Sequence, residues 1–128
     1  FENSSILKII KLAAEQGFKL VITTDHGMVY VKKPSQVVGD RETSTNIRYK
    51  TGKSLTYDEK DVWAITNPEK LFLPKGNLSS KYIFAKNNIF LAYPKNYNHF
   101  VNYYKDTYQH GGISLEEIII PISILEPK

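Results

Sequence analysis

The sequence contains no cysteine, one tryptophan and one methionine among its 128 residues. Without cysteine the fold uses neither disulfide bonds nor thiolate zinc sites, and the compartment is left open with the cytoplasm favoured. No run of about 18 apolar residues and no signal-peptide pattern is present, so we expect a cytoplasmic protein without a membrane partner.

The length and the charge of the chain limit its fold and its partners. A chain of 128 residues forms at most one small domain. Because it opens at Phe1 directly on helix-forming sequence, we expect it to be a segment of a longer polypeptide. The net charge of +4 and the pI near 9.2 favour an anionic substrate but fall short of a dedicated nucleic-acid-binding tail.

The first part of the sequence predicts an α/β fold. Apolar residues recur at helical spacing from Ile6 to Ala13, with Ser4 or Ser5 as N-cap and Gly17 at the C-terminal end. The apolar and β-branched stretch 18–23 predicts a fully buried strand. A helix, a glycine and a buried strand make half of a βαβ unit, which predicts the last crossover onto a parallel sheet.

The rest of the chain predicts short strands and loops. We expect a strand at 28–31 and a long polar surface loop at 35–57. The segment 61–65 is ambiguous, and the segment 68–74 is expected to be irregular. A β-hairpin of 81–86 and 89–93, a partly helical aromatic loop after Pro94 and an edge strand at 118–125 complete the chain. Ser114 and Glu117 have the spacing of a capping box at the start of a short helix.

The segment Thr23–Gly27 places an aspartate and a histidine where a predicted buried strand ends. Ligands in open α/β sheets gather at the carboxyl ends of strands, and Asp25 with His26 offers an oxygen and a nitrogen to one divalent cation. The alternative is a simple turn, since aspartate favours turn positions. A carboxylate at this position is expected to be desolvated unless a cation pairs with it, which favours the metal site.

A second imidazole occurs in the segment His110-Gly111-Gly112, ahead of a short helix and the last strand. A single histidine before two glycines is more often structural than a ligand. Together, the Asp-His-Gly and His-Gly-Gly segments are more specific than either alone, and they predict part of a two-metal hydrolase site.

Basic and aromatic side chains in the middle of the chain are candidate substrate contacts. Arg41, Arg48, Lys50 and Lys53 are candidates for contacts with phosphate, and the alternative is a solvated loop face. Arg41 is the most specific of them, because it stands in a Gly-Asp-Arg sequence. The aromatic run 97–108 either stacks nucleobases or packs the domain, and His99 within it is expected to be a surface or packing residue.

At these motifs the chain resembles the C-terminal part of a PglZ domain, a branch of the alkaline phosphatase superfamily. The matching segments are Thr-Thr-Asp-His-Gly at 23–27, Gly-Asp-Arg at 39–41 and His-Gly-Gly-Ile-Ser-Leu-Glu-Glu at 110–117. Three further segments, at 46–50, 101–106 and 125–128, are similar to PorX-type response regulators of Bacteroidetes. The resemblance covers essentially the whole chain. It implies a sheet sandwiched by helices, with an inserted loop and β-hairpin region.

The resemblance also implies a site. Asp25 and His26 would bind the zinc ion that also holds the nucleophile, and His110 would bind a second zinc. The nucleophile and the remaining ligands lie upstream in the family order, so this segment contains no catalytic nucleophile and is expected to be inactive in isolation. Arg41 and Arg48 are the predicted substrate-binding residues.

We therefore predict one segment of a PglZ domain over residues 1–128, within a zinc-dependent phosphodiesterase or phosphatase effector linked to type IX secretion. The expected partners are a phosphate-ester substrate with oligonucleotides among the candidates, an upstream receiver domain of the same polypeptide, a second copy in a homodimer, and a sigma factor. One alternative is a catalytically silent interaction module that binds a regulatory partner such as the sigma factor. Another is a nucleic-acid-binding segment without chemistry.

Overall fold

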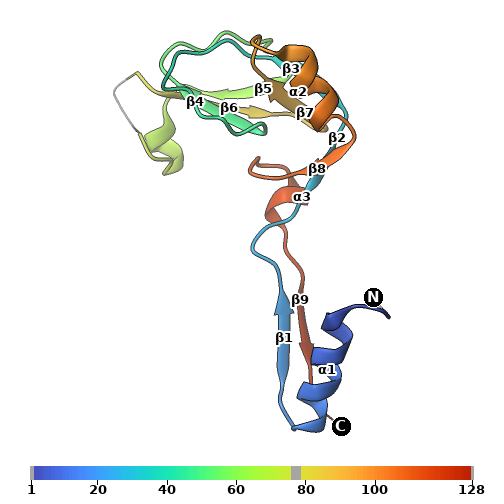
Figure 1. Ribbon diagram of the computed structural model, residues 1–128. Coiled ribbons are helices and arrows are strands. Elements are labelled where there is room, and N and C mark those ends of the chain that lie inside the picture. The colour runs from blue at the N-terminus through green and yellow to red at the C-terminus, as the bar shows by residue number, and fades with distance from the viewer. Residues whose placement is uncertain (1, 76–78, 128) are drawn as a thin grey trace. The chain divides into compact units, whose positions relative to one another are not determined.

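The computed structural model describes residues 2–75 and 79–127, and it divides them into two compact units (Figure 1). Unit 1 combines the chain up to His26 with the chain from Ile119 onward, and unit 2 runs from Gly27 to Ile118. In the described part of the chain, no helix is long and apolar enough to cross a membrane.

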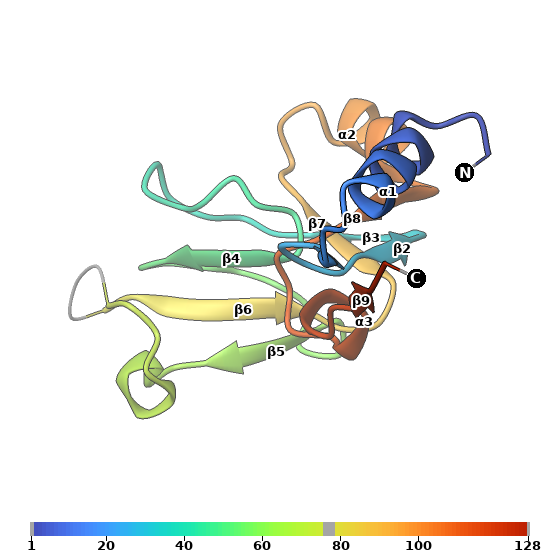
Figure 2. The same ribbon diagram turned by 90° about the horizontal axis from the view of Figure 1, so that it is seen from below.

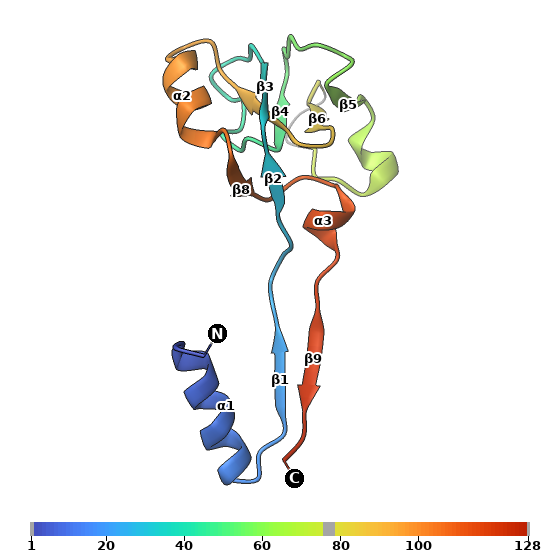
Figure 3. The ribbon, with the colours of Figure 1, turned by 90° about the vertical axis from the view of Figure 1, so that its right-hand side faces the viewer.

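Unit 1 consists of one helix and two strands that come from opposite ends of the sequence. Helix α1 spans Ser5–Glu15, and strands β1 (Leu20–Thr23) and β9 (Ile122–Leu125) pair antiparallel and lie side by side in Figure 3. The helix ends as predicted, because Gly17 adopts a φ of +75° and donates to Ala14 O while Phe18 donates to Ala13 O. This pair of hydrogen bonds is the Schellman motif that glycine permits at a helix C-terminus.

The predicted burial of the first strand is wrong in unit 1. Val21 is 57% exposed, α1 has no buried residue, and β9 is exposed along its whole length. The physical reason is that two strands and one helix cannot cover both faces of a ribbon. The predicted parallel pairing of this strand is also wrong, because β1 pairs antiparallel with β9. The predicted closing strand is confirmed in its second half, after Pro121.

Unit 2 contains the other strands, in three small sheets (Figure 2). Strands β2 (Val29–Val31) and β8 (Thr107–Gln109) pair antiparallel, and β3 (Lys33–Gln36) and β7 (Ile89–Ala92) pair parallel. The third sheet has the order β4-β6-β5, formed by Tyr49–Gly52, Lys81–Ala85 and Val62–Ile65. The helical elements of this unit are η1 (Pro68–Leu71, a 3-10 helix), α2 (Tyr97–Tyr104) and α3 (Leu115–Ile118).

Two apolar clusters form the core of unit 2. The first cluster gathers Val37, Val62, Ile83, Ala85, Ile89 and Leu91 between the β3–β7 pair and the three-stranded sheet. The second gathers Val29, Val31, Phe90 and Ala92 under the aromatic face of α2. Three aromatic side chains of the run 97–108, Tyr97, Phe100 and Tyr104, pack against this second cluster. For these three residues the structure agrees with the predicted packing role.

Several predictions of local structure need correction in unit 2. The stretch 35–57 is not a surface loop throughout, because it contains the end of β3, the strand β4 and the buried side chains of Arg48 and Lys50. The strands predicted on either side of Asn87-Asn88 exist, but they do not pair as a hairpin: β6 pairs with β4 and β5, and β7 pairs with β3. The described chain is therefore mixed α/β with small sheets and few helices, and the predicted helix-covered sandwich stays a prediction.

Candidate functional site

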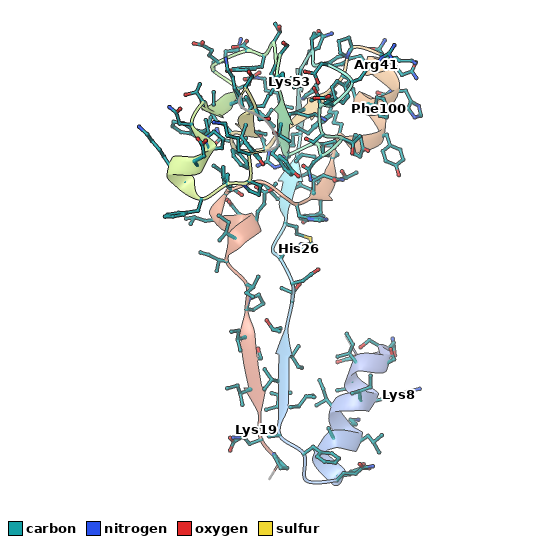
Figure 4. All side chains as sticks on the ribbon, turned by 90° about the vertical axis from the view of Figure 1, so that its left-hand side faces the viewer. Lys8, Lys19, His26, Arg41, Lys53 and Phe100 are labelled. Carbon is teal, nitrogen blue, oxygen red and sulfur yellow. The ribbon has the colours of Figure 1, made fainter. Side chains whose placement is uncertain are left out.

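The predicted metal ligands Asp25 and His26 follow β1 in unit 1, and Figure 4 labels His26. His26 Nε2 lies 3.6 Å from Asp25 Oδ1. For ligand bonds of about 2.1 Å, neighbouring donors of a tetrahedral zinc stand about 3.4 Å apart, so the two side chains fit one shared cation. The single hydroxyl proton of Thr24 is shared between the backbone oxygen of His26, 3.0 Å from Oγ1, and Asp25 Oδ1, 3.3 Å from Oγ1. This contact links the Asp25 carboxylate to the backbone of His26.

The expected desolvation of Asp25 is not observed. The side chain of Asp25 is 85% exposed and that of His26 is 35% exposed. The physical reason is the same as for β1, because the small unit 1 provides no further layer that could bury the end of the strand. Asp25 is therefore open to solvent, and burial contributes no argument for a metal at this position.

His110 follows β8 in unit 2 and precedes two glycines that hold a tight loop. Gly111 has a φ of +97°, a backbone conformation that side chains disfavour. A Cβ at Gly111 would lie 2.6 Å from Asn46 Nδ2, and a Cβ at Gly112 would overlap the carboxylate of Glu117. The glycines are thus required by the close approach of Asn46 and Glu117 to the loop that carries His110.

A buried ion pair between Arg48 and Glu117 fastens this loop to the sheets. Arg48 Nε donates to Glu117 Oε1 at 2.9 Å, and Arg48 Nη2 donates to Oε2 at 3.0 Å. Neither side chain is exposed by more than 1%. The same carboxylate accepts hydrogen bonds from Gly112 N at 2.9 Å and from Ser114 N at 3.3 Å, so Glu117 ties both ends of the turn after His110.

Arg48 also binds the two strands that flank the turn at Asn87-Asn88. Its guanidinium donates to the carbonyl oxygens of Ile89 and of Ala85, the latter at 3.3 Å. Burial acts to raise the pKa of Glu117, but the hydrogen bonds from Arg48 and from Gly112 N outweigh it and hold that pKa below its usual value. Glu117 therefore stays ionised, and its negative charge is balanced by the positive charge of Arg48 within the core.

This geometry replaces the predicted substrate contact of Arg48. The prediction placed Arg48 on a surface loop, whereas the structure buries it completely and engages its guanidinium with Glu117 and two carbonyl groups. The reason is that Arg48 directly precedes strand β4 (Tyr49–Gly52), where its side chain pairs with Glu117 behind the His110 loop. In this structure Arg48 therefore holds the site loop in place, and no face of it is left for a phosphate.

Arg41, the other predicted substrate contact, is exposed on a turn that Asp40 organises. The Asp40 carboxylate accepts hydrogen bonds from Glu42 N, Thr43 Oγ1, Lys53 N and Ser54 N at 3.0–3.3 Å. Arg41 and Lys95 line a cavity of about 600 Å³ together with the rings of Tyr93 and Phe100. Figure 4 shows Arg41 and Phe100 close together on unit 2. The Asp40 carboxylate also lines the cavity, but its four hydrogen bonds engage it within the turn. Arg41 and Lys95 are the two cations of the lining, which makes the position a candidate for an anionic group.

The family model for the BREX system PglZ alkaline phosphatase-like domain matches residues 3–124. The chain belongs to the PglZ family. No curated protein matches the sequence significantly. The match confirms the predicted family, and an alkaline phosphatase-like domain suggests a hydrolase of phosphoesterase type. The closer similarity to PorX-type response regulators stays a prediction.

The described part of the PglZ domain does not bring the three predicted metal ligands into one group. Within residues 2–75 and 79–127, no three histidine, aspartate or glutamate side chains form a group that could hold a metal ion. Asp25 and His26 belong to unit 1, and His110 belongs to unit 2. A zinc site in a protein uses three or four protein ligands, so the Asp25–His26 pair fits zinc in donor type and spacing but not in number.

Sequence reasoning missed Glu117 as the residue that shapes the site loop of the PglZ domain. It explained Glu117 by the position near the start of a short helix. The hydrogen bond from Ser114 N to Glu117 confirms one half of the predicted capping box, while Ser114 Oγ has no hydrogen-bond partner among the described residues. The only available signal was that capping position, three residues after Ser114. Nothing in the sequence indicated its partner, because Arg48 stands 69 residues away along the chain.

Proposed function

We propose that this PglZ domain supplies part of a dinuclear zinc site in a phosphodiesterase or phosphatase. Asp25 and His26 would bind one zinc and His110 the other. The observation that carries the proposal is the 3.6 Å separation of Asp25 Oδ1 and His26 Nε2, which suits one shared cation, in a chain of an alkaline phosphatase-like family. The nucleophile and the other ligands are expected outside residues 1–128.

When bound, two zinc ions would stabilise the charge on the attacking and leaving oxygens of an in-line displacement at phosphorus. The residues of this chain have simpler tasks. Asp25 and His26 would each provide one ligand atom to the zinc, and Thr24 Oγ1 contacts the Asp25 carboxylate. The exposed Asp25 carboxylate would break no buried ion pair when it binds. The Arg48–Glu117 pair and the two glycines hold the loop of His110.

Arg41 would bind the phosphoryl oxygens of the substrate. It stands with Lys95 in the cavity over Tyr93 and Phe100, and a guanidinium can bind two phosphate oxygens at once. The mildly basic charge of +4 agrees with an anionic substrate. We propose a phosphate ester, with oligonucleotides among the candidates, and a role as the effector of a PorX-type response regulator that controls type IX secretion.

The test uses the full-length protein. Zinc content is measured by mass spectrometry, and turnover is measured with a chromogenic phosphodiester for the wild type, Asp25→Ala and the control Asp58→Ala. Asp58 is a surface aspartate that pairs with Lys60 at 2.6 Å. We expect two zinc ions and turnover in the wild type and the control, and loss of turnover in Asp25→Ala. Wild-type turnover in folded Asp25→Ala contradicts the proposal, and a protein that stays zinc-free in zinc buffer favours the interaction module instead.

A further inference from the structure

The side chain of Lys50, in the middle of β4, is a buried cation without a carboxylate partner. Its exposed fraction is 1%. Lys50 Nζ donates one hydrogen bond, to Thr45 O at 3.2 Å, and lies 4.1 Å from the centre of the Tyr93 ring. Across the described residues no aspartate or glutamate forms an ion pair with it. An ammonium group has three donors, so the protein satisfies this one incompletely.

Lys50 lines a small cavity with mostly apolar walls. The cavity has a volume of about 220 Å³ and is lined by Ile47, Leu91, Ala92, Phe100 and Tyr104 as well as by Lys50, Thr45 and Tyr93. Phe100 and Tyr104 form one wall, with their rings stacked 6.2 Å apart at 13°. Tyr93 is held in place because its hydroxyl donates to Ser44 O at 2.7 Å. These contacts hold the rings of Tyr93, Phe100 and Tyr104 in the cavity wall.

We propose that this cavity binds a small monocarboxylate with an aromatic body, its carboxylate on Lys50 Nζ and its ring against Phe100 and Tyr104. The single positive charge of Lys50 in this apolar lining balances the single negative charge of a monocarboxylate. A phosphate monoester carries nearly two charges at neutral pH and needs several donors, which the cavity lacks. The volume lies just below the range of drug-sized ligand pockets, which limits the ligand to about one ring.

The protonation of Lys50 supports this assignment. Burial lowers the pKa of Lys50 to about 8, because no nearby negative charge offsets the loss of water. The other titratable groups that line the cavity are the phenols of Tyr93 and Tyr104, and the lining contains no carboxylate. A bound carboxylate therefore favours the charged form of Lys50, and binding takes up a proton near pH 8.

The experiment is a calorimetric titration of the full-length protein with phenylacetate at pH 8, in two buffers of different ionisation enthalpy. Benzyl alcohol serves as the neutral probe and inorganic phosphate as the compact anion. We expect phenylacetate to bind with uptake of about half a proton, and benzyl alcohol and phosphate to bind at least about tenfold more weakly. The Lys50 cavity contains none of the proposed zinc ligands, although it shares Tyr93 and Phe100 with the Arg41 cavity. Phenylacetate binding is measured without turnover, so its outcome is separate from that of the proposed hydrolase activity.

Two variants identify the group responsible. Lys50→Met keeps the length and the apolar stem of the side chain but removes the charge, so it should lose at least about tenfold in phenylacetate affinity and all proton uptake. Lys81→Met removes an exposed lysine from β6 and should bind like the wild type. Equal binding by folded Lys50→Met overturns the proposal. The proposal is also overturned if the wild type does not bind phenylacetate, or if it binds phenylacetate without proton uptake. These two measurements do not depend on the folding of any variant.

Discussion

Arg48 and Glu117 meet side-on inside unit 2, with Nε–Oε1 and Nη2–Oε2 distances of 2.9 and 3.0 Å, although 69 positions separate them in the sequence. The pair joins the strand entry at Arg48 to the loop after His110, and it does so without exposure to water. Removal of one partner therefore leaves an uncompensated charge in the core.

The first prediction concerns this pair. Arg48→Met should lower the free energy of unfolding by about 3–5 kcal/mol, because it leaves the Glu117 carboxylate buried and unpaired. The double variant Arg48→Met/Glu117→Leu should recover a large part of that loss, since it removes both charges. The measurement is urea unfolding of the 128-residue chain, followed by the fluorescence of Trp63, the single tryptophan.

A surface ion pair provides the control for this prediction. Lys53 Nζ lies 2.8 Å from Glu42 Oε2, and both side chains are about half exposed or more. Lys53→Met should change the free energy of unfolding by less than about 1 kcal/mol. A loss for Arg48→Met that is no larger than the loss for Lys53→Met would show that the buried pair contributes nothing specific.

The second prediction concerns alkaline stability and Lys50. Its pKa in the folded protein is about 8, below the ordinary value of 10.5, so the unfolded chain binds more protons between these two values. The free energy of unfolding should therefore rise with pH through this window as the buried ammonium loses its charge. The difference between wild type and Lys50→Met isolates the effect from the other lysines and the tyrosines. A difference that is constant from pH 7 to pH 10 would contradict the prediction.

The third prediction concerns the glycine beside His110. Gly111→Ala combines a backbone conformation at φ +97° with a Cβ 2.6 Å from Asn46 Nδ2, and it should lower the free energy of unfolding by about 2–4 kcal/mol. Gly17→Ala, at φ +75° with no atom within 4 Å of the added Cβ, is the matched control and should cost only about 1 kcal/mol. Thermal unfolding of both variants makes the comparison. Equal losses of stability would mean that the Asn46 side chain moves away from the added Cβ at no cost in free energy.

The fourth prediction concerns turnover in the full-length protein. Arg41→Ala should reduce kcat/KM by about 10²–10³-fold, as expected for the loss of one donor to the charge of the transition state. His110→Ala should be more severe, because it removes a proposed metal ligand. His99→Ala is the control, since His99 is exposed and its ring contacts Phe100 and Tyr103 on the same helix, α2. A loss in His99→Ala as large as in Arg41→Ala would show that general damage to α2 explains the effect.

Local signals in the sequence predicted what depends on near neighbours. The helix α1 and its glycine terminus were predicted because the spacing of apolar residues and the conformation at Gly17 are local properties. The adjacent Asp25 and His26, 3.6 Å apart, were predicted as a pair for the same reason. The family was predicted from the same short motifs, and the family match confirms it.

Long-range pairing could not be predicted in the same way. Strands β6 and β7 have the length and the Asn-Asn turn of a hairpin, but they pair in two different sheets. The Arg48 guanidinium donates to the carbonyl oxygens of Ala85 and Ile89, one from each strand. Arg48 and Lys50 are buried although charged side chains are expected on the surface. Each is buried against a partner distant in the sequence, Arg48 against Glu117 and Lys50 against Tyr93, which the local sequence does not reveal. The exposure of Val21 likewise follows from the small size of unit 1.

The parallel pairing of β3 with β7, from Lys33↔Ile89 to Gln36↔Ala92, bears on the rate at which unit 2 folds. The pair closes only after the chain between the two strands has been arranged, and such distant closure slows folding. A hairpin of the neighbouring segments β6 and β7 can form in about 1–10 μs, far earlier. The turn at Asn87-Asn88 is kept in the native structure, where Ile89 N donates to Lys86 O at 3.0 Å, although β7 pairs with β3 and not with β6. We therefore expect the parallel pairing of β3 with β7, and not the turn, to limit the rate at which unit 2 folds.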